Sequence, residues 1–333
     1  MAAIIANPLD FNVDDLYVDL RQSIGCRLYL KCEGFNFAGS IKIKAAAEMV
    51  GAMERSGELR PGGTLVESSS GNMGVALSVV AASRGYRFVC VTDVRCTLTA
   101  RRAMEALGSE VHVITEPDAE GGFLGARLAR VARLCDENEG YLWLNQYANP
   151  GNWRGHYRTT GPEIAKAFPD VEVVFIGAGT TGTLMGCARY FRENRPEVTI
   201  VAVDTVGSVT FGRPSGRRLI PGLGTSVRPP ILDASYADDV VYVTEPETVR
   251  TCRRLVRHGF LFGGSTGTVV AGARDWLARN AAHGTATAVA IAPDLGGNYL
   301  DTVYDEEWVA RAFGADVTAD VTADVAADVA ADV

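Results

Sequence analysis

One lysine near the N-terminus stands where a helix is expected to begin. Residues 36–42 read NFAGSIK, a Gly-Ser turn followed by Lys42, and residues 43–56 have a helical pattern. A lysine at a helix start lies near the positive end of the helix dipole and partly out of water, which lowers its pKa and suits Schiff-base chemistry. Lys44 is the nearest competitor, and spacing alone does not separate the two lysines.

Three loops rich in glycine and hydroxyl groups could hold anions. Residues 69–74 read SSGNMG, residues 177–183 read GAGTTGT and residues 263–268 read GGSTGT, and each precedes a helical pattern. Free N–H groups and hydroxyls at a helix start bind carboxylate or phosphate. A Schiff-base lysine combined with such loops suggests an enzyme that uses pyridoxal phosphate.

The second of these loops also matches a dinucleotide fingerprint. Gly177, Gly179 and Gly182 have the G-x-G-x-x-G spacing, and Asp204 follows where an acid that binds ribose is expected. The three threonines of the loop favour a terminal phosphate over a bridging pyrophosphate. An NAD-dependent enzyme would also leave Lys42 without a role, and an NAD-binding assay separates the two hypotheses.

Strand-like and helix-like runs alternate along the chain, which predicts an α/β fold with mostly parallel, doubly wound sheets. The predicted strands are residues 27–32, 64–67, 87–92, 110–114, 171–176, 199–203, 240–243 and 286–292. The predicted helices are residues 43–56, 75–85, 99–107, 123–138, 162–167, 182–194, 245–258, 269–279 and 300–311. The composition changes near residues 145–158, where we expect a domain boundary.

Composition narrows the class of protein. The chain of 333 residues is 47% hydrophobic, with seven scattered cysteines and four histidines that form no metal motif. We expect a cytoplasmic protein with reduced thiols, without a secretory signal, membrane span or zinc site. Residues 316–333 are an acidic repeat that we expect to be disordered. No basic pattern supports nucleic-acid binding.

The motifs resemble the fold-type-II pyridoxal-phosphate enzymes, specifically their cysteine synthase branch. Residues 40–42 look like the Ser-x-Lys element with the Schiff-base lysine, and residues 69–74 are similar to the Thr-Ser-Gly-Asn-Thr-Gly substrate loop. Residues 179–183 resemble the Gly-Thr-Gly-Gly-Thr phosphate cup, and residues 264–267 resemble the segment whose serine faces the pyridine nitrogen. These motifs occur in matching order over residues 29–304.

The resemblance implies a tryptophan synthase beta-like fold and a homodimer. Residues 35–147 would form a smaller substrate-loop domain, and residues 1–34 with 148–315 a larger cofactor-phosphate domain. Two departures from the branch stand out: residues 13–17 read VDDLY in place of Gly-x-Thr-Pro-Leu, and Met73 replaces a threonine in the substrate loop. The second departure removes a hydroxyl near the substrate carboxylate and therefore bears on the first substrate.

Within the branch, the chain resembles the subfamily that makes N-(2-amino-2-carboxyethyl)-L-glutamate, a precursor of L-2,3-diaminopropionate for siderophores and antibiotics. Residues 116–122, 145–149, 203–209, 221–224, 293–294 and 299–301 carry this resemblance. It implies a β-replacement that joins O-phospho-L-serine to L-glutamate and releases phosphate. A cysteine synthase that uses sulfide with O-acetyl- or O-phosphoserine is the main alternative, and a non-catalytic binding module is a third.

The resemblance also implies roles for the motif residues. Lys42 would hold the cofactor and remove the substrate α-proton. The cofactor would be bound by Lys42, Asn72, Gly179, Thr180, Thr181, Gly182, Thr183 and Ser265. The amino-acid substrate would be bound by Ser69, Ser70, Gly71, Gln146, Arg127 and Tyr147.

Three of these roles have a specific chemical reason. Asn72 would bind the phenolic oxygen of the cofactor, and Ser265 would leave the pyridine nitrogen largely unprotonated, which favours elimination at Cβ. Arg127 and Tyr147 would recognise the phosphate leaving group, because an arginine fork suits phosphate. Ordinary helix caps and a solvated helix face are the competing interpretations of these residue types.

Overall fold

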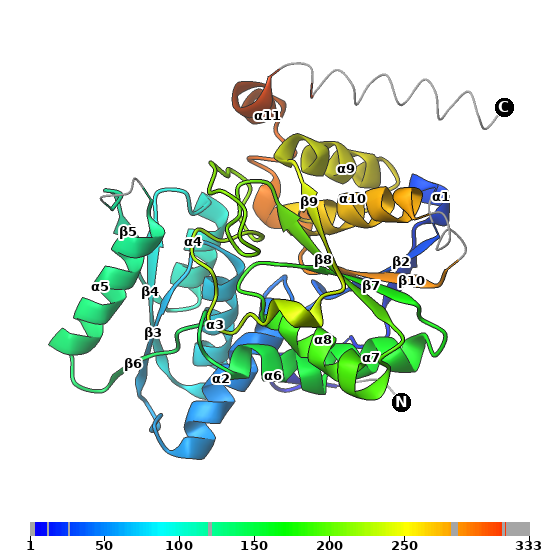
Figure 1. Cartoon of the computed structure of the whole chain (residues 1–333). Coiled ribbons are helices and arrows are strands. Elements are labelled where there is room, and N and C mark those ends of the chain that lie inside the picture. The colour runs from blue at the N-terminus through cyan, green and yellow to red at the C-terminus, as the bar shows by residue number, and fades with distance from the viewer. Residues whose placement is uncertain are drawn as a thin grey trace.

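The computed structural model describes residues 4–11, 13–25, 27–118, 122–280, 286–314 and 317, and it contains two sheets (Figure 1). The larger sheet is built from β1 (Tyr17–Asp19), β2 (Leu28–Cys32), β7 (Val173–Gly177), β8 (Thr199–Thr205), β9 (Asp239–Val243) and β10 (Ala288–Ala292). The smaller sheet is built from β3 (Thr64–Ser68), β4 (Arg87–Asp93), β5 (Glu110–Ile114) and β6 (Tyr141–Trp143).

Both sheets are almost entirely parallel. The larger has the strand order β1-β2-β10-β7-β8-β9, and only the pairing of β1 with β2 is antiparallel. The smaller has the order β5-β4-β3-β6, with every pairing parallel. The predicted α/β fold class is confirmed. The division into residues 35–147 and the two flanking segments stays a prediction, and the smaller sheet takes its strands from within residues 64–143.

Helices cover both faces of each sheet (Figure 1). The α-helices are α1 (Arg21–Ile24), α2 (Lys42–Ser56), α3 (Asn72–Arg84), α4 (Leu98–Ala106), α5 (Leu124–Glu137), α6 (Gly151–Arg158), α7 (Thr160–Ala167), α8 (Gly182–Asn194), α9 (Glu245–Arg257), α10 (Gly264–Arg279) and α11 (Glu306–Phe313). Short 3-10 helices are η1 (Pro8–Asp10), η2 (Ala234–Tyr236) and η4 (Gly296–Tyr299).

Alternation along the central strands divides the larger core into two layers. In β7, Val173 and Phe175 pack with residues of α10, whereas Val174 and Ile176 pack with residues of α8. Successive side chains of a strand point to opposite faces, so a strand covered on both faces must be apolar throughout. This explains why these strands were recognisable as continuous hydrophobic runs.

Several elements of the structure were not predicted, because tertiary contacts rather than local sequence pattern determine them. The strands β1 and β6 were not predicted, because each has three residues at a sheet edge. The helix α6 was also missed, because glycines 151 and 155 are weak helix formers. A Cβ at Gly155 would lie 2.9 Å from the Lys44 carbonyl oxygen, so glycine allows α6 to approach α2 closely.

The last two predicted helices have different limits in the structure. α10 begins at Gly264 rather than at residue 269, which places Ser265 in its first turn. The predicted helix 300–311 is wrong in its first half, since α11 begins after Asp305, whose carboxylate accepts a 2.6 Å hydrogen bond from the Trp308 N–H. Apart from Val317, the predicted acidic tail lies outside the described residues. In the described ranges, no helix has both the length and the apolar character needed to cross a membrane.

Candidate active site

A cavity of about 240 Å³ is lined by segments of both sheets, at the carboxyl ends of β3 and β7. Ligands of doubly wound proteins bind beyond the carboxyl ends of parallel strands. Every residue predicted for the site lines this cavity: Lys42, Ser69, Ser70, Gly71, Asn72, Arg127, Gln146, Tyr147, Gly179, Thr180, Thr181, Gly182, Thr183 and Ser265. The individual roles of these residues stay predictions.

Lys42 is the first residue of α2, as its position after the Gly-Ser turn predicts. The preceding residues are fixed against the end of the larger sheet, because the Ile41 N–H donates to the Pro293 carbonyl at 2.7 Å and Ser40 pairs with Asp294. Burial lowers the pKa of Lys42, and the nearby negative charge of Asp294 opposes this only in part. A lysine of lowered pKa has a larger fraction of neutral, nucleophilic amine.

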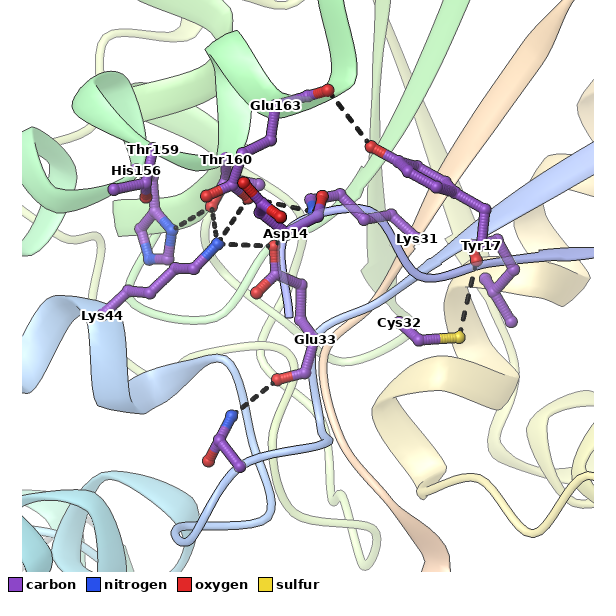
Figure 2. Close-up of polar contacts among 12 residues, drawn as sticks. Asp14, Tyr17, Lys31, Cys32, Glu33, Lys44, His156, Thr159, Thr160 and Glu163 are labelled. Atoms are coloured by element: carbon purple, nitrogen blue, oxygen red, sulfur yellow. Dashed lines mark hydrogen bonds and ion pairs between the residues drawn. The ribbon is translucent and has the colours of Figure 1, made fainter. Parts of the chain in front are cut away.

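The competing lysine, Lys44, lies in a separate buried charge cluster, which we define as Lys31, Glu33, Lys44 and Glu163 (Figure 2). Lys44 Nζ lies 2.9 Å from Glu33 Oε1 and 2.6 Å from Glu163 Oε2. An amine held in ion pairs with two carboxylates is not free to attack a cofactor. Of the two lysines only Lys42 lines the cavity. The structure therefore favours Lys42 over Lys44 as the Schiff-base lysine, a choice that sequence spacing alone did not make.

The loop before α8 has the features of a phosphate site. Thr181 has a left-handed backbone with φ of 67°, and its hydroxyl is buried without a hydrogen-bond partner among the described residues. Thr180 Oγ1 accepts a 2.9 Å hydrogen bond from Asn152 Nδ2. The first N–H groups of α8 have no partner within the helix. An unpaired buried hydroxyl beside free N–H groups fits the phosphate of pyridoxal phosphate.

The glycines of this loop allow neighbouring segments of the chain to approach it closely. A Cβ on Gly182 would overlap Asn152 Oδ1, and a Cβ on Gly179 would lie 2.7 Å from the Gly222 carbonyl oxygen. Both positions therefore require glycine. Asn152 also donates to the Gln146 carbonyl at 2.6 Å, and so connects the loop to the segment after β6. A role for Asn152 could not be predicted from the sequence, because its contact with Thr180 depends on the position of α6 in the fold.

The substrate loop is stabilised by its own hydroxyl group. Ser69 Oγ accepts hydrogen bonds from the N–H groups of Gly71 at 3.3 Å and Gly74 at 2.9 Å, at the start of α3. Gln146 Nε2 donates to the Ser68 carbonyl at 2.9 Å. The hydroxyl of Ser69 thus caps the start of α3. The residue also lines the cavity.

Glu67 is a buried acid directly beneath this loop. Its Oε1 accepts from the Ser68 N–H at 2.7 Å, and its Oε2 accepts from the Gln146 N–H at 3.0 Å. Burial raises the pKa of Glu67 to about 7, although these hydrogen bonds oppose the shift. Its carboxyl group joins the substrate loop to the Gln146 segment. This role could not be predicted from the sequence, since a glutamate within a strand belongs to no motif.

Asp294 is the second acid that sequence reasoning did not assign. It is buried, and its carboxylate accepts hydrogen bonds from Tyr299 Oη at 2.5 Å, Thr266 Oγ1 at 3.0 Å and Asn72 Nδ2 at 3.3 Å. Burial raises the pKa of Asp294, while its hydroxyl partners, Ser265 among them, oppose the shift. Asp294 therefore links Ser265, which lines the cavity, to the loop that carries Asn72.

The two residues predicted to bind the leaving phosphate have different surroundings. Arg127 is buried, and its Nε lies 3.2 Å from Asp93 Oδ2. It is not the solvated helix residue of the competing interpretation, but its charge is shared with Asp93. Burial raises the pKa of Tyr147, so its phenol remains a neutral hydrogen-bond donor.

Asp204, the acid of the dinucleotide fingerprint, does not reach the site. It lies near the end of β8, is fully buried and accepts a 2.8 Å hydrogen bond from the Thr205 N–H. It does not line the cavity. The three glycines therefore have the fingerprint spacing without an acid of the fingerprint at the cavity.

The fold and the cavity define a pyridoxal-phosphate enzyme, and comparison with known proteins gives the same class. The chain belongs to the family described as pyridoxal-phosphate dependent enzyme, whose model matches residues 17–294. It is 39% identical over 286 residues to the N-(2-amino-2-carboxyethyl)-L-glutamate synthase of Ralstonia nicotianae, covering 85% of this chain and 84% of that protein. It is 37% identical over 300 residues to the protein of the same name from Cupriavidus metallidurans, covering 88% of each.

Solved structures show the same architecture. An O-ureido-L-serine synthase superposes with a TM-score of 0.83 and 33% identity, covering 92% of this chain and all of that one. An O-acetylserine dependent cystathionine beta-synthase from Helicobacter pylori superposes with a TM-score of 0.83 and 25% identity, covering 90% of this chain and 99% of that one. The predicted family and cofactor are confirmed.

Proposed function

We propose that this protein joins O-phospho-L-serine to L-glutamate, giving N-(2-amino-2-carboxyethyl)-L-glutamate and phosphate. The observation that carries the proposal is the similarity, over most of the chain, to two synthases named for this product. The cavity supports it, because Arg95, Arg127 and Arg218 are among its lining residues. Two acidic substrates need several cationic groups, whereas a cysteine synthase that uses sulfide needs fewer.

Pyridoxal phosphate, when bound, withdraws electrons from the α-carbon of the amino acid and so acidifies its α-proton. The residues of the chain would then act as follows. Lys42 takes the α-proton, because it lines the cavity and burial lowers the pKa of its amine. The loop of residues 179–183 holds the cofactor phosphate, and Ser70 with Gln146 orients the substrate α-carboxylate. Arg127 and Tyr147 face the leaving phosphate.

The bond changes balance without another reactant. The Cβ–O bond of O-phospho-L-serine breaks, and phosphate leaves with the electron pair. The α-amine of L-glutamate forms a bond to Cβ and loses a proton, and the α-carbon regains one from Lys42. A site that separates these two halves gives ping-pong kinetics. A homodimer and a cytoplasmic location belong to the same proposal, and light scattering of the purified protein tests the former.

The test mixes the purified holoenzyme with O-phospho-L-serine and either L-glutamate or sulfide. We expect phosphate release and a product with the mass of the glutamate adduct. Parallel reactions with O-acetyl-L-serine determine the first substrate. Cysteine formation with sulfide, without a glutamate adduct, would make the protein a cysteine synthase and overturn the proposal. No turnover with either nucleophile, despite bound cofactor, would favour the non-catalytic binding module.

A further inference from the structure

Two arginines that sequence reasoning did not single out, Arg95 and Arg218, line the active-site cavity. Arg218 belongs to the segment between β8 and β9, and Arg95 follows β4 in the smaller sheet. The two arginines therefore follow strands of different sheets and line the same cavity. Neither is part of the phosphate loop or of the substrate loop.

Arg218 has donors that the protein itself does not use. Its Nη2 donates to Ser226 Oγ at 2.8 Å, but its Nε and Nη1 are buried and have no hydrogen-bond partner among the described residues. A buried, unpaired guanidinium donor costs free energy unless a ligand satisfies it. The local backbone accommodates this arrangement, since a Cβ on Gly224 would overlap Arg218 Nη1.

The two carboxylates that attract Arg218 are each bonded to backbone N–H groups through one oxygen. Asp204 and Glu245 attract Arg218, but neither forms an ion pair with it in the part of the chain that the structure describes. Glu245 Oε1 accepts from the N–H groups of Leu219 at 2.7 Å and Ile220 at 2.6 Å, and Asp204 accepts from the Thr205 N–H. Asp204 Oδ2 is buried without a hydrogen-bond partner among the described residues, and it forms no ion pair with Arg218, so part of the guanidinium remains free for a ligand.

Arg95 places a second positive charge near the first. Its side chain is exposed, and its guanidinium lies 4.8 Å from the centre of the Phe123 ring. Its backbone N–H donates to Asp93 Oδ1 at 2.8 Å. Repulsion from Arg95 lowers the pKa of Arg218, in addition to the larger effect of burial. An anion between the two guanidinium groups would relieve this repulsion.

The other anionic groups of the proposed reaction already have sites. The phosphate of the cofactor has the loop of residues 179–183, and the α-carboxylate of the first substrate has Ser70 and Gln146. The leaving phosphate has Arg127 and Tyr147. The carboxylates of the second amino acid have none.

We propose that Arg218, assisted by Arg95, binds the side-chain carboxylate of the second substrate, and this inference rests on the function proposed above. The exposed side chains of Arg95 and Ser226 mark this part of the cavity as its outer rim. The attacking α-amine must reach inward to Cβ, so the side-chain carboxylate is the anionic end of L-glutamate that remains near the rim. A carboxylate accepts two parallel hydrogen bonds from an arginine fork.

The test uses Arg218→Gln, which removes the charge and keeps much of the volume, with Arg217→Gln as the matched control. Arg217 is adjacent, exposed and does not line the cavity. Ping-pong kinetics allow the halves to be measured separately. Phosphate release from O-phospho-L-serine without a second substrate reports the first half, and KM for L-glutamate reports the second.

We expect Arg218→Gln to raise KM for L-glutamate at least about tenfold and to leave the first-half rate within about twofold of wild type. We also expect it to lose the discrimination of L-glutamate against L-glutamine, whose side chain is neutral, whereas Arg217→Gln keeps it. A slower first half with an unchanged KM for L-glutamate would assign Arg218 to phosphate and overturn the inference, as would no change in either half. Wild-type enzyme that makes no glutamate adduct would instead contradict the proposed function itself.

Discussion

The side-chain amide of Asn72 donates a 3.3 Å hydrogen bond to the buried carboxylate of Asp294. Asn72 begins α3 after the smaller sheet, and Asp294 follows β10 of the larger sheet, so this bond joins the two halves of the cavity. The same carboxylate attracts Lys42 and is bonded by Tyr299. Asp294 thus influences the charge of Lys42 and the position of the loop that carries Asn72.

Replacing Asp294 by asparagine should change the pH profile of the reaction. The negative charge of Asp294 raises the pKa of Lys42, against the larger effect of burial. Its removal lowers that pKa further, so the acid limb of kcat for phosphate release should move to lower pH. Asp301→Asn, at an exposed position, is the control. An acid limb at the wild-type pH in Asp294→Asn would show that this charge does not act on the base.

A methyl group at Gly182 should weaken cofactor binding. A Cβ there would overlap Asn152 Oδ1 and displace the phosphate loop. We expect Gly182→Ala to raise the dissociation constant of pyridoxal phosphate about tenfold or more, measured by titration of the apoenzyme. Gly297→Ala, where a Cβ meets open space, should bind like wild type. Equal affinities for the two variants would argue against a phosphate site in this loop.

Glu67 should make the free energy of unfolding decrease as the pH rises, because the pKa of its carboxyl group is raised in the folded protein. Its pKa is raised from 4.5 to about 7 by burial, so between these values the folded protein keeps a proton that the unfolded chain has lost. The contribution of Glu67 to the free energy of unfolding is fully present below about pH 4.5 and is lost as the pH rises through about 7. The loss is roughly 3 kcal/mol.

Glu67→Gln cannot titrate and should remove this dependence. The difference in unfolding free energy between the variant and wild type should therefore favour the variant more at pH 8 than at pH 5. Denaturant titrations at the two pH values measure it, with the exposed Glu58→Gln as the control. A difference that is independent of pH would place the charged form of Glu67 in the fold at both values.

The cluster of Lys31, Glu33, Lys44 and Glu163 should act on stability rather than on cofactor attachment. Lys44→Met leaves two buried carboxylates with one lysine between them (Figure 2). We expect a loss of about 3 kcal/mol in unfolding free energy, while borohydride still fixes the cofactor to the variant. Arg21→Met, which breaks the exposed pair with Asp19, should cost much less. Loss of cofactor attachment in folded Lys44→Met would contradict this assignment.

Local pattern was sufficient for the elements that carry the site. The helix over residues 182–194 has the predicted limits, because a glycine-rich loop and an amphipathic run define both its ends. The strand over residues 110–114 was also predicted with its exact limits. The predicted binding residues follow the carboxyl ends of parallel strands or lie at helix starts, which is why they converge on one cavity.

Contacts between segments that are distant in the chain could not be predicted from the sequence. Lys42 and Lys44 have equivalent spacing. The folded chain distinguishes them, because Lys42 lines the cavity and Lys44 is paired with the carboxylates of Glu33 and Glu163. Asp294 acts through residues far away in the chain, such as Asn72. Arg218 shows its unpaired donors only when the surrounding loop has folded.

The proposed function requires that Lys42 holds the cofactor in this cavity. The direct measurement reduces the holoenzyme with borohydride, digests it and locates the pyridoxyl group by peptide mass. We predict that the label is on Lys42 and that Lys42→Ala binds the cofactor without covalent attachment and releases no phosphate from O-phospho-L-serine. A label on Lys44 or another lysine, or turnover in Lys42→Ala, would contradict the role proposed for Lys42.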